Sequence, residues 1–237
     1  MQIFLRPLLV LALSGPALVN AQTGHEALDL SERLAACNVC HGARGEGTAG
    51  SEYVPHLAGK PRDYLLQQLR AFRDGGRQHA QMAWLVRNLD DGYLEEISAH
   101  FAAMPPRTRA VLAEAPAATD PRAIALVQRG DPARGIAACT ACHGDDLTGL
   151  EPAIPALVGL PADYVVAQFG AWRTGVRNAR EPDCMGAIAD ALEPTEIRAL
   201  ASWLATQGHA DPRPPAAAGS FTPPQDCGGL SNAEAQP

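Results

Sequence analysis

The sequence predicts an all-α fold made of two similar domains in tandem. Three observations support this prediction. Segments of the first half recur in the second half at a shift of about 100 residues. Apolar residues recur three and four positions apart, which is typical of helices. No stretch alternates apolar and polar residues over a length typical of a strand.

The repeat is clearest around two cysteine-containing runs. Cys37 to Gly42 reads CNVCHG, and Cys139 to Gly144 reads CTACHG. A second pair of matching segments is PHLAGKPRDY, from Pro55, and PALVGLPADY, from Pro155. Further matches join Gln68, Phe72, Arg73, Gly75 and Arg77 to Gln168, Trp172, Arg173, Gly175 and Arg177. Two such copies predict two domains of similar structure.

Composition and apolar periodicity divide the chain into five segments. Arg6, an apolar stretch and small residues up to Ala21 are typical of a cleavable signal peptide. Two Pro- and Ala-rich segments without helical periodicity indicate a linker and a tail. The predicted segments are 1–21, signal peptide; 22–104, N-terminal domain; 105–121, linker; 122–209, C-terminal domain; and 210–237, tail. The signal peptide predicts that the protein is exported to the periplasm.

Capping signals place three helices in each copy. We expect the first to start at Asp131-Pro132 and run into Cys139, with residues 29–36 as its counterpart. The second should start at Pro61 or Pro161 and end at Gly75 or Gly175. The last should cover about 91–103 and about 194–206.

The charge and composition of the chain argue against two classes of partner and indicate a cofactor. The formal net charge of −7 makes nucleic acid and anionic lipid poor partners. The excess acid lies mostly in the second half, so we expect the two domains to dock differently and with salt-sensitive rates. Aromatic residues make up only 5% of the chain. Each domain would therefore have a thin core unless it packs around a cofactor.

The two Cys-x-x-Cys-His runs predict two covalently attached haem c groups. Paired thiols at this spacing can bond to the two vinyl groups of one haem, and the following imidazole can bind the iron. The expected attachment residues are Cys37, Cys40, Cys139 and Cys142, with His41 and His143 as iron ligands. A zinc site would need four converging thiolates, and a thioredoxin-like redox pair a βαβ context. Neither alternative suits two separate helical repeats.

Two methionines at equivalent repeat positions are candidates for the second iron ligand. Met82 follows His41 at nearly the same distance as Met185 follows His143. A thioether favours ferrous iron and completes the coordination shell. The alternatives are that both methionines only pack in the core, or that His79 binds iron in place of Met82. Five other residues lack a repeat partner and are expected to pack or to lie at the surface: His25, His56, His100, Met104 and His209.

These motifs together resemble the dihaem cytochrome c4 family, over roughly residues 31–207. The resemblance implies two class I cytochrome c domains with His41 and His143 as proximal ligands and Met82 and Met185 as distal ligands. It also implies that the carbonyls of Pro55 and Pro155 accept the imidazole Nδ1–H. The function implied is electron transfer without catalysis, because no coordination position stays open. Expected partners are a quinol-oxidising complex and a terminal oxidase or reductase, with docking on a membrane complex.

The second copy has three additional residues before its methionine, in the segment that ends at Cys184, and the tail contains Cys227. These two cysteines remain after haem attachment, in an oxidising compartment, so we expect a disulfide between them. Two free thiols, or Cys184 as an iron ligand, are the alternatives.

Three other functions stay open from the sequence. A haem electron-transfer subunit of a periplasmic dehydrogenase, such as a flavocytochrome c sulfide dehydrogenase, would copurify with a flavoprotein. A peroxidase would need one haem without its distal methionine. A thiol protein without haem would be colourless.

Overall fold

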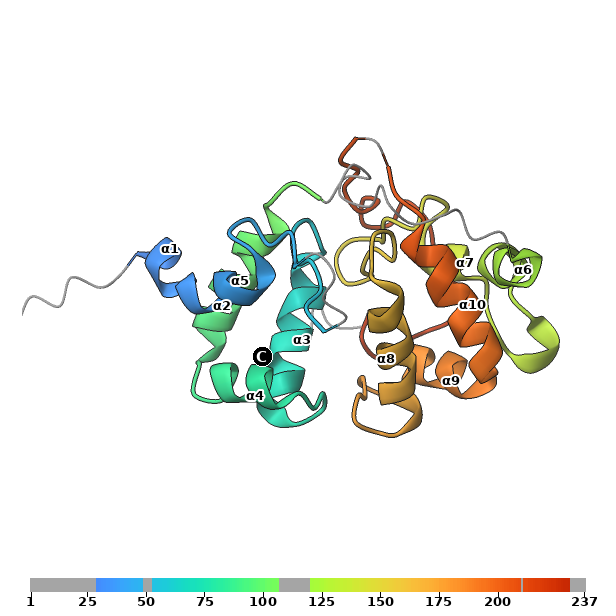
Figure 1. Cartoon of the computed structure of the whole chain (residues 1–237), viewed down its shortest axis with the longest axis horizontal. Coiled ribbons are helices and arrows are strands. Elements are labelled where there is room, and N and C mark those ends of the chain that lie inside the picture. Colours follow the sequence, from blue (N-terminus) through green and yellow to red (C-terminus); the bar gives the residue numbers. More distant parts are fainter. Residues whose placement is uncertain (1–28, 49–52, 107–119, 210, 231–237) are drawn as a thin grey trace, which may run out of the picture.

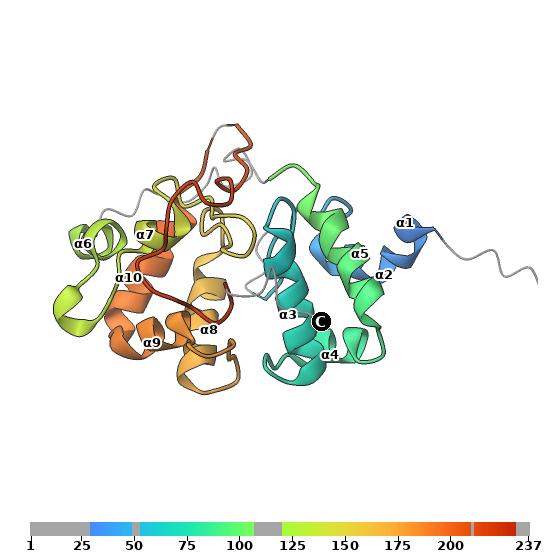
Figure 2. The same ribbon diagram turned by 180° about the vertical axis from the view of Figure 1, so that it is seen from behind.

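The structure is a computed structural model that describes residues 29–48, 53–106, 120–209 and 211–230. The predicted signal peptide and residues 107–119 of the predicted linker lie outside these residues. The described residues form helices and no β-strand, which confirms the predicted all-α class. None of the described helices is long and apolar enough to cross a membrane. Figures 1 and 2 show the helices in two groups that lie side by side.

The N-terminal group packs around the buried side chains of Leu34, Leu94 and Phe101. Its helices are α1 (Leu30–Arg33), α2 (Ala35–His41), α3 (Arg62–Asp74), α4 (Ala80–Val86) and α5 (Asp91–Ala102). The carboxylate of Asp29 caps α1, and that of Asp90 caps α5. Helix α3 ends at Gly75, whose φ of 88° is left-handed and suits glycine.

The C-terminal group repeats this arrangement, with α6 before the cysteine-bearing helix where the first group has α1. Its helices are α6 (Pro121–Arg129), α7 (Cys139–His143), α8 (Ala162–Arg173), α9 (Cys184–Ala191) and α10 (Pro194–Ala205). In the repeat, α7 to α10 correspond to α2 to α5. Helix α8 packs mainly against α10 and α9, as α3 packs mainly against α5 and α4.

The expected helix from Asp131 to Cys139 is wrong. Pro132–Arg134 form only a short 3-10 helix, which Gly135 ends with a left-handed φ of 71°. The backbone then turns back, and Asp131 and Ile136 exchange hydrogen bonds of 2.7 and 3.0 Å. The helix that precedes the second cysteine run is instead α6, capped by Asp120, and its start at Pro121 lies in the last residue assigned to the linker.

The other expected helices are nearly correct. Pro61 and Pro161 are the N-cap residues of α3 and α8 rather than their first helical residues. Helix α8 ends at Arg173, with Thr174 as its C-cap, so Gly175 lies one residue beyond the cap. The segment 29–36 is helical but is split into α1 and α2 at Leu34.

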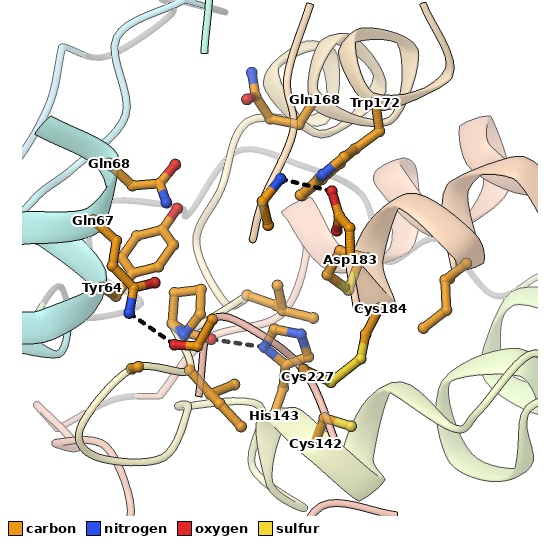
Figure 3. A pocket seen from close by; sticks show the side chains of 18 of the residues that line it. Tyr64, Gln67, Gln68, Cys142, His143, Gln168, Trp172, Asp183, Cys184 and Cys227 are labelled. Carbon is orange, nitrogen blue, oxygen red and sulfur yellow. Dashed lines mark hydrogen bonds between the residues drawn. A yellow bond between two sulfur atoms is a disulfide. The ribbon is translucent and has the colours of Figure 1, made fainter. Parts of the chain in front are cut away.

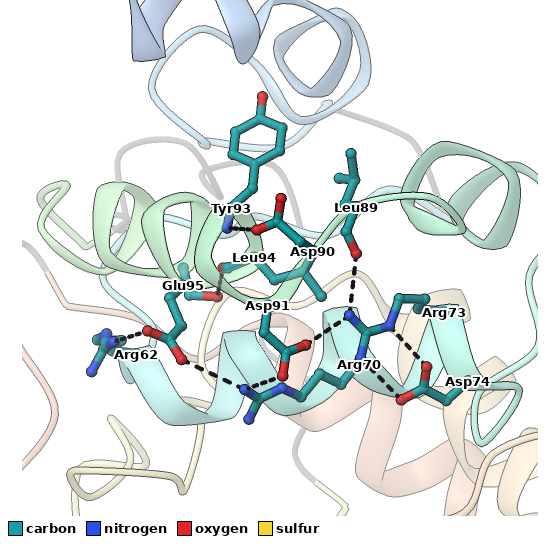
Figure 4. Close-up of polar contacts among 11 residues, drawn as sticks. Arg62, Arg70, Arg73, Asp74, Leu89, Asp90, Asp91, Tyr93, Leu94 and Glu95 are labelled. Carbon is teal, nitrogen blue, oxygen red and sulfur yellow. Dashed lines mark hydrogen bonds and ion pairs between the residues drawn. The ribbon is translucent and has the colours of Figure 1, made fainter.

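A polar network fixes α3 against α5 (Figure 4). The guanidinium of Arg73 donates to Asp91 at 2.7 Å and to the Leu89 carbonyl at 3.2 Å. In the second domain, Arg173 donates to the Leu192 carbonyl at the same 3.2 Å. Each exposed ion pair stabilises by only about 0.5 kcal/mol. The arginine–carbonyl bond is the part of this network that both domains share, and it joins α3 or α8 to the segment before the last helix.

Candidate haem sites

The first candidate site begins at α2, which carries Cys37, Cys40 and His41. Cys37 packs against the N-terminal core, Cys40 is exposed and His41 is buried. The Nδ1–H of His41 donates to the Pro55 carbonyl at 2.9 Å, which confirms the expected hydrogen bond. Burial is the main cause that lowers the pKa of His41. The imidazole is therefore neutral, held in one tautomer, and has Nε2 available for a metal.

The second candidate site has the same construction on α7. The Nδ1–H of His143 donates to the Pro155 carbonyl at 2.8 Å. Burial lowers the pKa of His143 to about 4, so this ring is also neutral at physiological pH. Both histidines thus present Nε2 as a metal ligand would, in two places that the repeat relates.

The four thiols of the two runs are not bonded to one another. Burial raises the pKa of the Cys139 thiol to about 11 and also raises the pKa of the Cys37 thiol. Reactive redox cysteines and metal-bound thiolates have a lowered pKa instead. Within the described ranges, no three Cys, His, Asp or Glu side chains converge as a zinc site would require. The environments of these cysteines therefore fit neither a redox pair nor a zinc site.

The two methionines lie at the start of equivalent helices. Met82 is on α4 and packs against the apolar cluster that includes Cys37. Met185 is on α9 and lines the cavity that also contains Cys139 and His143. His79, the alternative ligand to Met82, is the N-cap of α4, and its Nδ1 accepts the Met82 backbone N–H at 3.4 Å. Met104 is partly buried just beyond the end of α5.

A cavity of about 600 Å³ joins the second site to the domain interface (Figure 3). Leu157, Val165 and Leu200 are among its apolar lining residues, and His143 and Met185 line it too. Tyr64 and Gln68 on α3 of the other domain complete its wall. A large apolar cavity with a neutral imidazole inside fits a haem.

Three buried cationic side chains at the domain interface are also compatible with a bound haem. Lys60, Arg77 and Arg177 are only 5%, 9% and 7% exposed. Among the described residues, none of the three has a carboxylate within ion-pair distance, since every ion pair found there involves other side chains. Burial lowers the pKa of Lys60 to about 8. Buried cations without a counter-charge are costly, and the carboxylates of bound haem would supply that charge.

The two arginines bridge the domains with neutral acceptors. Arg77 donates to Tyr164 at 3.0 Å and to Gln168 at 2.6 Å. Arg177 donates across the interface to Tyr64 and Gln68 at 3.4 and 3.2 Å. The loops that carry these arginines also pair, with Gln78 N–H donating to the Val176 carbonyl and Asn178 N–H to that of Gly76, each at 2.7 Å.

The sequence analysis assigned no role to this interface. Its signal was present in the repeat, because Gln68 and Arg77 match Gln168 and Arg177 at identical spacing. Nothing in the sequence showed that each arginine reaches the other domain. Lys60 has no such signal, since Leu160 stands at its repeat position.

The disulfide expected between Cys184 and Cys227 is present in the structure. It joins Cys227 to Cys184 (Figure 3), which is the first residue of α9 and directly precedes Met185 in the chain. The alternatives of two free thiols and of Cys184 as an iron ligand are therefore wrong.

We compared the chain with known proteins to find relatives by sequence. No family model matches the chain. The thiosulfate dehydrogenase electron acceptor of Thiomonas intermedia is 37% identical over 73% of this chain and 79% of its own length. Cytochrome c4 of Pseudomonas aeruginosa is 34% identical over 83% of this chain and 94% of its own.

Two solved structures resemble the fold. Reduced recombinant cytochrome c4 from Pseudomonas stutzeri has a TM-score of 0.61 and 28% identity, over 76% of this chain and 96% of its own. Thiosulfate dehydrogenase (TsdBA) from Marichromatium purpuratum has a TM-score of 0.64 and 36% identity over 72% of this chain. The match spans only 36% of that longer protein.

Proposed function

The chain belongs to the cytochrome c4 family of dihaem c-type cytochromes, and from this premise we propose the residues that hold its haems, its location and its electron donor. It carries two covalently attached haem c groups and transfers electrons. Family membership also supports the class I cytochrome c fold of its domains.

The residues that hold the haems have the same roles in both domains. They are Cys37, Cys40, Cys139 and Cys142 for attachment, His41 and His143 as proximal ligands, and Met82 and Met185 as distal ligands. The observation that carries this assignment is the repeated hydrogen bond from each imidazole Nδ1–H to a proline carbonyl. This bond would fix both rings with Nε2 free to bind the iron of each haem.

The cofactor would supply a one-electron centre, and His41 with Met82 and His143 with Met185 would hold its iron and leave no ligand position for a substrate. The protein holds it in place, keeps water from it with apolar side chains, and supplies buried cations for its carboxylates. The chain is accordingly an electron carrier and not an enzyme. It works in the periplasm, which agrees with the signal peptide predicted from the sequence.

The electron donor is a dehydrogenase that oxidises thiosulfate. Support comes from two relatives, each 37% identical, that are named thiosulfate dehydrogenase electron acceptors. A quinol-oxidising complex is the second candidate, because of the similarity to cytochromes c4. In either case the acceptor is a terminal oxidase or reductase. The first candidate retains the idea of a haem partner for a periplasmic dehydrogenase, with thiosulfate in place of sulfide as substrate.

The test is a rapid-mixing measurement on the oxidised mature holoprotein. Thiosulfate dehydrogenase with thiosulfate should reduce both haems within its turnover time, and more slowly at high salt. The same enzyme without thiosulfate is the control. Reduction only by a quinol-oxidising complex with quinol would assign the second donor. Reduction by neither donor would contradict the carrier function.

A further inference from the structure

The described part of the tail, residues 211–230, runs across the C-terminal domain as an irregular segment that we call the strap. Arg213 forms an ion pair with Asp146 at 2.6 Å. Ala216 then exchanges backbone hydrogen bonds of 2.9 Å with Gly149 and Glu151. These contacts attach the first part of the strap to the loop that follows His143.

The middle of the strap approaches the haem-binding helix. The ring of Phe221 lies beside Gly144, directly after His143. Further along, Gln225, Cys227 and Leu230 are lining residues of the cavity that contains His143 and Met185. The strap therefore forms one wall of the second haem cavity.

The end of the strap is fixed to both domains. Cys227 is bonded to Cys184, and the Gly228 N–H donates to the Pro182 carbonyl at 3.0 Å. Gly228 lies so close to the Glu181 carbonyl that a Cβ would not fit there. From the other domain, Nε2 of Gln67 on α3 donates to the Gly229 carbonyl at 2.7 Å.

The disulfide is attached where it can act on the distal ligand. Cys184 is the first residue of α9 and Met185 is the second. A thioether binds iron weakly, so its position must be held by the surrounding structure. A side chain caps the start of both helices, His79 at α4 and Asp183 at α9, but only α9 also has a disulfide there.

We propose that the strap, through Cys227–Cys184 and the Gln67–Gly229 hydrogen bond, positions the sulfur of Met185 and closes the second haem cavity to outside ligands. Cys227, Cys184 and Gln67 are positioning residues, because each acts through Met185 or the strap. This inference rests on the proposed ligation by Met185. The described residues around the first site include no equivalent device, so the first haem serves as an internal reference.

The test uses the complete holoprotein with both haems attached. In the C184S/C227S variant, we expect the far-red band of the ferric iron–sulfur bond to fall to about half. External imidazole should bind one haem at least tenfold faster than in the parent protein, and one of the two reduction potentials should fall, since methionine ligation raises it. The band, binding rate and potential of the other haem should not change.

A matched pair of variants tests the hydrogen bond to the strap. Q67A should accelerate imidazole binding to the same haem by a few-fold. Q128A, at an exposed glutamine on α6, should leave it unchanged. Equal rates for Q67A and the parent protein would remove Gln67 from the proposal.

M185L separates this inference from the ligand assignment. It should halve the far-red band. A full band in M185L would show that Met185 is not a ligand, and the strap proposal would fail with it. A halved band in M185L together with a full band and unchanged imidazole binding in C184S/C227S would overturn the strap proposal alone.

Discussion

The N-terminal and C-terminal domains orient His41 and His143 in the same way, with proline carbonyls at 2.9 and 2.8 Å. They differ in what surrounds these histidines. The second domain has a disulfide at the helix of its candidate distal ligand and a strap along its cavity. The first has neither among its described residues. The groups that bind haem are thus repeated, while the structure that encloses the haem differs between the copies.

The difference also extends to how the last helix of each domain is held. In α10, Glu196 is 1% exposed and forms ion pairs of 2.9 Å with both Arg122 and Arg134. At the equivalent position of α5 stands Tyr93, whose ring lies 4.5 Å from the guanidinium carbon of Arg33. One domain uses a buried carboxylate where the other uses an aromatic ring. Their stabilities should therefore respond differently to pH.

The largest expected effect comes from removing one haem. The C139S/C142S variant should contain a single haem by mass, and its C-terminal helices should unfold because the cavity of about 600 Å³ loses its contents. The C37S/C40S variant should do the same to the N-terminal domain. Mass spectrometry and helical circular dichroism measure both. Full helical content in either variant would show that its core does not depend on the cofactor.

The next effect concerns Glu196. Arg134 is the main cause that lowers the pKa of Glu196 to about 2. The stabilisation by this carboxylate is complete above the ordinary glutamate pKa and is lost as the pH falls toward 2. E196Q should lower the free energy of unfolding of the C-terminal domain by about 1–3 kcal/mol at pH 7.

Denaturant titrations at several pH values measure this difference. The acid-dependent loss of stability should be smaller in E196Q than in the parent. The matched Y93L variant should lower the free energy of unfolding of the N-terminal domain by only about 0.5–1 kcal/mol. The acid-dependent loss of stability of that domain should not change. Equal costs for E196Q and Y93L would mean that the two helices are held equally strongly.

A smaller effect is expected at the interface. Removing a buried cation near the haems disfavours the reduced state, which carries one more negative charge. R77Q and R177Q should each lower a reduction potential by an amount on the order of 0.5–1 kcal/mol per electron. R129Q, at an exposed arginine, is the control. Redox titrations with unchanged potentials would place the haem carboxylates away from these arginines.

Local signals in the sequence predicted much of the fold and of the site. Pro61 and Gly75 bound α3 to within one residue, because both act through their own backbone geometry. The cysteine runs indicated haem attachment for a similar reason, since the spacing itself specifies the chemistry. Helix α6 was missed because Asp131-Pro132, with the same capping pattern, indicated the start of the helix before the second cysteine run. The apolar residues Ala123, Leu126 and Val127 nevertheless follow Asp120-Pro121 with helical spacing.

The rest depends on contacts between distant residues. Lys60 is buried because it lies at the interface between the two domains. No residue near Lys60 in the sequence indicates this interface. The path of the strap depends on a bond across 43 residues and on Gln67 of the other domain. The two cysteines left over after haem attachment predicted the disulfide. They did not predict that the strap forms one wall of the second haem cavity.

The most direct test of the whole account is the intact mass and ferric spectrum of the mature holoprotein, measured without reductant. Two repeated sites and one disulfide predict two haem additions, no thiol that reacts with an alkylating agent after unfolding, and two low-spin haems that both contribute to the far-red band. One haem addition, a free thiol, or a high-spin fraction that binds carbon monoxide readily would contradict it.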